Sequence, residues 1–197
     1  GFAVDHLGDA IARLYERYAE RLPGGPERAR AAATARSVAM LLGPQTLDRY
    51  ASALAPAIEI VDHRILGTHS THGVAAALQG LGSFLALTHD FAVRVDEVLA
   101  LEPSALLLRG RSCCTDRSSG GSFERPYITL QVVGTDGLMT RCEFFDAENA
   151  VGALARWDEL AAPPKGRVRR VPANAATANA ARFDAAVSAR DEGALAA

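Results

Sequence analysis

The sequence predicts an α+β fold in which helices come first and an antiparallel sheet follows. Residues 5–56 carry apolar side chains at spacings of three and four, which is the period of a helix. Residues 91–146 instead contain four strand-like runs separated by turn residues. A final helical pattern covers residues 147–161. Helices followed by a meander of strands are typical of α+β proteins, in which the helices lie on one side of the sheet.

Three helices are expected before the first strand. The first begins near Asp5 and ends at Pro23-Gly24-Gly25, because proline and glycine stop helices. The second covers about Glu27 to Leu42, and Gly43-Pro44-Gln45 ends it. A short third helix lies in TLDRYASALAP and stops at Pro56.

The period then changes from helix to strand. AIEIVDHR, residues 57–64, alternates like a strand, and THGVAAALQGLGSFLALTHD, residues 71–90, is helical, with Ser70 or Thr71 available to cap it. The four strand-like runs that follow are FAVRVDEVLALE, ALLLRGRSCCTDR, RPYITLQVVGTDG and GLMTRCEFFD. SSGG and TDG supply turns between them, and Asp146 is placed to cap the last helix.

The composition indicates the class of protein. Formal net charge is −2 and no basic cluster stands out within residues 1–161, which argues against nucleic acid or an anionic membrane as a partner. Three cysteines without a CxxC pair fit a reducing compartment, and no apolar run is long enough to span a membrane. No cofactor motif is present. We therefore expect a cytoplasmic protein without a cofactor.

Four parts are predicted along the chain. An N-terminal helix occupies residues 1–26 and an α+β domain residues 27–162. A basic, proline-bearing linker covers residues 163–173, and another helix covers residues 174–197. Both this helix and the second helix contain the sequence AATA, so the C-terminal helix is either the start of a second repeat or a chance similarity between alanine-rich helices.

Residues 28–161 resemble the SnoaL-like branch of the nuclear transport factor 2-like superfamily. The segments that carry the resemblance are ARAAATARSVAMLL, AIEIVDHRILG, HGVAAALQGL and GTDGLMTRCEFFDAENAVGAL. The resemblance implies a cone-shaped, curved antiparallel sheet wrapped around the N-terminal helices, an apolar pocket, and a homodimer. The tandem arrangement also resembles the C-terminal regions of large actinobacterial regulatory proteins, in which this domain would be one module.

The resemblance also implies a set of pocket residues. Asp62 stands where ketosteroid-isomerase relatives place a catalytic base, and Glu143 stands where epoxide-hydrolase relatives place an acid. The residues expected to line the pocket around them are Arg109, Arg111, Ile128, Leu130, Arg141 and Phe145.

Neither catalytic set is complete. The oxyanion donors of the isomerases are matched by Val38 and Ile128, which cannot donate a hydrogen bond. The second acid of the epoxide hydrolases is matched by Arg111 or Cys113. We therefore expect a non-catalytic module that binds an apolar small molecule or mediates dimerisation. The alternative is an enzyme of the polyketide cyclase, isomerase or epoxide hydrolase type that uses Asp62 and Glu143.

The alternation of the strands allows a second arrangement. Three charged pairs (Arg94 with Asp96, Arg109 with Arg111, and Arg141 with Glu143) fit one polar face turned to solvent or a partner. Leu106, Leu108, Cys142 and Phe144 would then face the core.

Three of the five histidines lie in residues 61–78. His63 follows Asp62 on a strand, so the two side chains point to opposite faces and do not form a dyad. His69 and His72 lie in a turn and no cysteine completes a zinc set, so we expect turn chemistry and no metal site.

Overall fold

The computed structural model describes residues 6–67 and 70–160. Three helices begin the chain: α1 (Leu7–Arg21), α2 (Pro26–Leu42) and α3 (Leu47–Ala53). α4 (Val74–Leu87) lies between the second and third strands, and α5 (Ala150–Leu160) follows the last strand. These helices match the predicted ones, with α4 shorter at both ends than expected.

Six strands form one sheet. They are β1 (Leu54–Asp62), β2 (Thr71–His72), β3 (Thr88–Glu102), β4 (Ala105–Asp116), β5 (Ser122–Val133) and β6 (Met139–Asp146). Their order across the sheet is β2-β1-β6-β5-β4-β3. All neighbours pair antiparallel except β1 and β6, which run parallel, so the sheet is mixed and not purely antiparallel.

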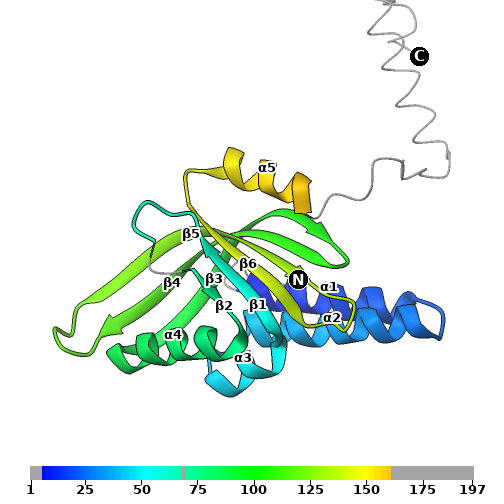
Figure 1. Cartoon of the computed structure of the whole chain (residues 1–197), viewed down its shortest axis with the longest axis horizontal. Helices are drawn as coiled ribbons and strands as arrows, with labels where there is room; N and C mark the ends of the chain where they lie inside the picture. The colour runs from blue at the N-terminus through cyan, green and yellow to red at the C-terminus, as the bar shows by residue number, and fades with distance from the viewer. Residues whose placement is uncertain (1–5, 68–69, 161–197) are drawn as a thin grey trace, which may run out of the picture. The chain divides into compact units, whose positions relative to one another are not determined.

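The helices cover both faces of the sheet (Figure 1), with α1 to α4 on one face and α5 on the other. On the inner face, Ile11 and Tyr15 of α1 and Val38 of α2 pack against Leu106 and Leu108 of β4. α1 is therefore part of the core of the domain. On the outer face, α5 packs Ala153 and Trp157 over a second cluster that includes Leu107, Ile128, Leu130 and Phe145.

The ends of two helices differ from the sequence prediction. Gly73, with a φ of 86°, precedes α4, and Ser70 instead accepts a hydrogen bond from the Asp62 backbone at 3.0 Å. At α5, the Asn149 side chain accepts the Gly152 N–H at 3.1 Å. Asp146 accepts the Ile65 N–H at 3.1 Å, so its carboxylate fixes the loop after β1 and does not cap α5.

The β5–β6 turn is held against α2. Gly137 lies in this turn with a φ of 82°, and a Cβ atom there would stand 2.3 Å from the Ala33 Cβ and 2.7 Å from the Ala33 carbonyl carbon. Ser37 donates a hydrogen bond to the Gly137 carbonyl at 2.5 Å. The predicted TDG turn thus fixes the sheet to the second helix at backbone contact distance.

The predicted linker (residues 163–173) and C-terminal helix (174–197) lie outside the described residues, as does His69. None of the helices in the described part of the chain is long and apolar enough to cross a membrane.

Candidate functional site

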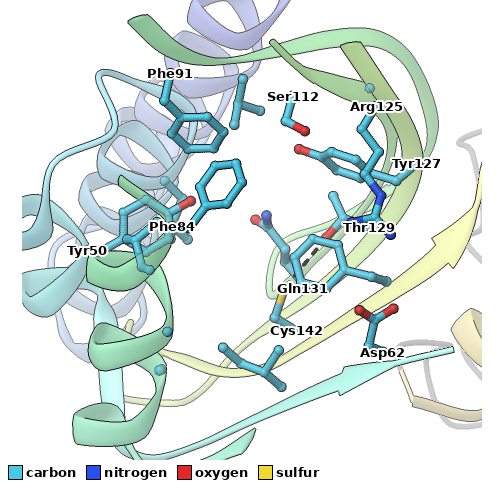
Figure 2. A pocket seen from close by; sticks show the side chains of 18 of the residues that line it. Tyr50, Asp62, Phe84, Phe91, Ser112, Arg125, Tyr127, Thr129, Gln131 and Cys142 are labelled. Atoms are coloured by element: carbon cyan, nitrogen blue, oxygen red, sulfur yellow. Dashed lines mark hydrogen bonds between the residues drawn. The ribbon is translucent and has the colours of Figure 1, made fainter. Parts of the chain in front are cut away.

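A cavity of about 590 Å³ lies between the inner face of the sheet and the helices α2 to α4. Its size is within the range of pockets for small organic molecules. Helices α3 and α4 and the adjoining β3 supply an aromatic wall of Tyr50, Phe84 and Phe91 (Figure 2). Phe84 and Phe91 meet edge to face, with ring centroids 5.0 Å apart. Most of the remaining helix residues at the cavity are apolar, so its helical side is mainly hydrophobic.

The sheet side of the cavity is more polar. β5 contributes Tyr127, Thr129 and Gln131, which point inward because residues two apart on a strand share a face (Figure 2). Thr129 is hydrogen-bonded to the Cys142 thiol at 3.6 Å. The Gln131 Oε1 is buried and has no hydrogen-bond partner within the described part of the chain. It is an acceptor without a partner on a residue that lines the cavity.

The two tyrosines at the cavity remain protonated at neutral pH. Burial raises the pKa of Tyr50 well above its ordinary value of 10, and the neighbouring Tyr127 and Cys142 add to the shift. Burial likewise raises the pKa of Tyr127. Both phenols are therefore neutral groups that can donate a hydrogen bond.

Charged side chains gather at one end of the cavity. Asp62 ends β1 there, and the Arg64 guanidinium binds its carboxylate through two bonds, at 2.8 Å from Nε and 2.6 Å from Nη2. The Arg64 guanidinium also lies 5.1 Å from the centre of the Phe144 ring, within the range of a cation–π contact. Arg125 reaches the same end from β5 and donates to the Leu66 carbonyl (Figure 2).

The structure separates Asp62 from Glu143 by the thickness of the sheet. Asp62 lines the cavity, as expected for a pocket carboxylate, whereas Glu143 lies under α5 on the outer face. Glu143 is fully buried. It accepts hydrogen bonds from His63 at 2.7 Å, from Arg156 at 3.1 Å and from Arg141, and Arg141 also pairs with Glu59. The two carboxylates cannot reach one substrate.

The six residues expected to surround the pocket do not line it. The register of β4, β5 and β6 turns them to the outer face, where α5 covers Ile128, Leu130 and Phe145. Arg141 belongs to the Glu143 cluster. Arg109 pairs with Glu97 and Arg111 pairs with Asp96, and all four side chains are partly or fully exposed. The second arrangement that the alternation allowed, with Leu108, Cys142 and Phe144 inward, describes the cavity face.

The histidine turn contains no gathered metal ligands in the part of the chain that the structure describes. His63 points to the outer face, where its ring stacks on Phe145 with centroids 4.7 Å apart. Its partner is Glu143 and not the adjacent Asp62, in agreement with the alternation of a strand. The thiols of Cys113 and Cys114 have pKa values raised by burial, which disfavours the reactive thiolate.

Sequence reasoning did not assign Arg64, Arg125, Tyr50, Phe84 or Phe91 to the site. The sequence places Arg64 at the end of the strand predicted over residues 57–64 and Arg125 at the start of the strand-like run RPYITLQVVGTDG. A usable signal was the position of these residues. Phe84 lies in the last turn of α4 and Phe91 near the start of β3, on either side of the helix–strand junction, and Tyr50 lies in the short α3 that precedes β1.

No protein-family model matches the chain, and no curated protein sequence matches it. Solved structures do resemble it. A pinacolase from Penicillium brevicompactum, BvnE, superposes with a TM-score of 0.50 and 12% identity over 72% of this chain and 96% of that one. A protein with a ketosteroid isomerase-like fold from Catenulispora acidiphila gives a TM-score of 0.47 and 13% identity over 60% and 88% of the two chains.

A protein from Mesorhizobium loti described as a SnoaL-like polyketide cyclase gives a TM-score of 0.46 and 17% identity over 58% of this chain and 96% of that one. At such identities the similarity concerns the fold alone. The curved six-stranded sheet around N-terminal helices, with a cavity between them, agrees with it. The chain therefore shares the α+β fold of the pinacolase BvnE, with a six-stranded sheet packed against the N-terminal helices.

Proposed function

We propose that this domain binds a small, largely apolar molecule inside the cone, and that binding, not catalysis, is its role. The observation that carries the proposal is the cavity of about 590 Å³, whose aromatic and aliphatic walls face a few polar groups at the sheet. Such a lining is characteristic of small-molecule sites, in which apolar area supplies affinity and convergent polar groups fix orientation.

The geometry of the carboxylates supports binding over catalysis. Asp62 is held in a two-pronged bond by Arg64, and a proton transfer to it would have to break charge-assisted hydrogen bonds. Glu143 is bound by three cationic or hydrogen-donating side chains on the far side of the sheet. An enzyme that uses both carboxylates on one substrate is therefore not supported by their positions.

The role in a larger protein is part of the same proposal. It rests on the sequence beyond residue 162, where a basic linker and a further helix are predicted. We propose that the domain is a binding module of a longer regulatory chain. Dimerisation stays a prediction from the sequence.

Filling the cavity should abolish binding of an apolar probe. Ser112 lines the cavity from β4 and makes no side-chain hydrogen bond within the described residues. Phenylalanine is well tolerated in strands and would occupy part of the space. We expect the wild-type domain to bind pyrenebutanol, a neutral fluorescent probe, saturably and at one site. Ser112→Phe should weaken this binding about tenfold or more, a loss of about 1.4 kcal/mol.

The matched control is Ser112→Ala, which removes the hydroxyl without filling space and should bind the probe as the wild type does. Fluorescence titration of the three proteins measures the affinities. Equal affinity in Ser112→Phe and Ser112→Ala, or no saturable binding by the wild type, would contradict the proposed function.

A further inference from the structure

The charged groups at the cavity do not balance. Among the described residues that line it are one carboxylate, that of Asp62, and three guanidinium groups, those of Arg64, Arg94 and Arg125. Arg94 is exposed on a sheet position whose neighbour across the pair is Arg111, so solvent reaches it. The charges that matter inside are therefore Asp62, Arg64 and Arg125.

Arg64 and Asp62 satisfy each other. Their side chains are 10% and 3% exposed, and two parallel hydrogen bonds join them. A bidentate pair of this kind is the strongest geometry for arginine and a carboxylate. The positive charge of Arg125 is left over at the same end of the cavity.

Arg125 has few partners for a half-buried guanidinium. A guanidinium carries five N–H donors. Within the described part of the chain, Arg125 donates to the Leu66 carbonyl, and no carboxylate there lies within ion-pairing distance of it. Donors therefore remain available on the side that Figure 2 shows turned toward Tyr127 and Thr129.

Burial and a neighbouring positive charge outweigh the negative charges near Arg125. Burial lowers the pKa of Arg125, and the neighbouring Arg64 lowers it further. The carboxylates of Asp62 and Asp146 act in the opposite direction without cancelling these effects. Asp146 does not line the cavity, and its oxygen accepts the Ile65 N–H. A negative charge beside Arg125 would relieve the imbalance.

We infer that the molecule bound in the cone carries one anionic group, a carboxylate or its equivalent, which pairs with Arg125 while its apolar body lies against Phe84 and Phe91. The inference rests on the proposed function and names the class of ligand: an apolar acid. The distribution of the lining supports it, because the charged residues lie at one end and the aromatic wall faces them across the cavity (Figure 2). Such a cavity orients an amphipathic molecule in one direction.

The test compares two probes with the same apolar body. Pyrenebutanoic acid is ionised at pH 7 and pyrenebutanol is neutral, and fluorescence titration gives the affinity of each. Removing Arg125 as Arg125→Gln should weaken the acid about tenfold or more, as expected for loss of a charge-assisted hydrogen bond, and leave the alcohol within about twofold. Asp62→Asn removes the negative charge that Asp62 contributes to the lining and should strengthen binding of the acid severalfold.

Arg111→Gln is the matched control. It removes the same charge from the same sheet, but Arg111 pairs with Asp96 and Glu124 on the outer face. Its affinities for both probes should equal those of the wild type. An equal loss of acid binding in Arg111→Gln and Arg125→Gln would mean that overall charge, and not the cavity, selects the acid, and would overturn the inference.

The outcomes separate the two proposals. If the alcohol binds and Arg125→Gln leaves the affinity for the acid unchanged, the anionic ligand is excluded and the apolar site stands. If neither probe binds the wild type, both proposals fail. If Arg125→Gln binds neither probe, the affinities of Arg125→Lys for both probes decide. Restored binding in which the acid binds more tightly than the alcohol supports the inference. Restored binding with equal affinities overturns it.

Discussion

Replacing Glu143 by alanine is expected to lower the free energy of unfolding by about 3 kcal/mol, because loss of one partner of a buried ionic cluster leaves the others uncompensated. The Glu143 side chain is 0% exposed and accepts hydrogen bonds from Arg141, Arg156 and His63. The two arginines are 26% and 30% exposed, so water can replace only part of what they lose. Urea denaturation measures the change.

Glu159→Ala is the control for this prediction. Glu159 pairs with the same Arg156 at 2.5 Å, but its side chain is 63% exposed, and exposed ion pairs contribute about 0–1 kcal/mol. Glu143→Gln, which keeps the size and one acceptor, should fall between the two. A loss in Glu143→Ala no larger than that in Glu159→Ala would show that the cluster does not hold α5 to the sheet.

The same carboxylate should make the free energy of unfolding depend on pH. Burial acts to raise the pKa of Glu143, but hydrogen bonds from Arg156, Arg141 and His63 outweigh it and hold the pKa below the ordinary value of 4.5. A group whose pKa is lower in the folded state stabilises that state above the unfolded value, and the contribution is lost as pH falls through the folded value.

The difference in unfolding free energy between wild type and Glu143→Gln should therefore be largest near neutral pH and shrink below about pH 4.5. Parallel denaturation series at several pH values measure it. A difference that stays constant down to the acid transition would mean that Glu143 does not titrate in this window.

The second large effect is expected at Gly137. Alanine there would be strained by the positive φ of 82°, and its Cβ would stand 2.3 Å from the Ala33 Cβ, 2.7 Å from the Ala33 carbonyl carbon and 2.9 Å from the Thr34 nitrogen. α2 would have to move away from the turn, which also weakens the Ser37 bond to the Gly137 carbonyl. Overpacking of this kind costs about 1–3 kcal/mol, and the backbone strain adds about 1 kcal/mol.

Gly120 separates the two causes. Its φ is 68°, similar to that of Gly137, yet nothing lies within 4 Å of a Cβ atom placed there. Gly120→Ala should therefore lose only the strain, about 1 kcal/mol. Thermal and urea unfolding of both variants test this. If Gly137→Ala were no less stable than Gly120→Ala, the close approach of the turn to α2 would carry no energy.

The elements of the fold followed from local patterns. α1 buries Ile11, Tyr15 and Ala19, which recur every four residues, so its period was visible in the sequence. The TDG turn could be predicted because Asp-Gly between two strands is a common hairpin turn, in which glycine takes the positive φ found at Gly137. The parallel pairing of β1 with β6 was not, because it joins segments about eighty residues apart, and no local signal encodes such a pairing.

The sequence did not show which face of each strand points to the cavity, and the assignment of the pocket residues depends on that face. Leu106, Leu107 and Leu108 of β4 are all buried, because the inner helices cover one face and α5 the other. A strand buried on both faces loses the alternation that assigns a face. The charged pattern of β6 was equally ambiguous, because Glu143 is buried under α5, where it pairs with the half-buried Arg141, and neither side chain lines the cavity.

The charged end of the cavity could not be derived from spacing. Arg64 and Asp62 are two residues apart and could be paired by inspection. Arg125 is brought to them by a sheet in which β6 lies between β1 and β5. Its leftover charge is a property of the folded arrangement, which depends on where every neighbouring acid ends up.

The alternation of packing residues and cavity-lining residues along β5 determines how the ligand specificity of this domain can change. Ile128 and Leu130 pack beneath α5. The alternating residues Tyr127, Thr129 and Gln131 line the cavity. Substitutions at alternate positions of this strand thus affect either the packing under α5 or the lining of the cavity, but not both. Substitutions at Tyr127, Thr129 and Gln131 can therefore change which ligand the cavity accepts, while Ile128 and Leu130 continue to hold α5 on the sheet.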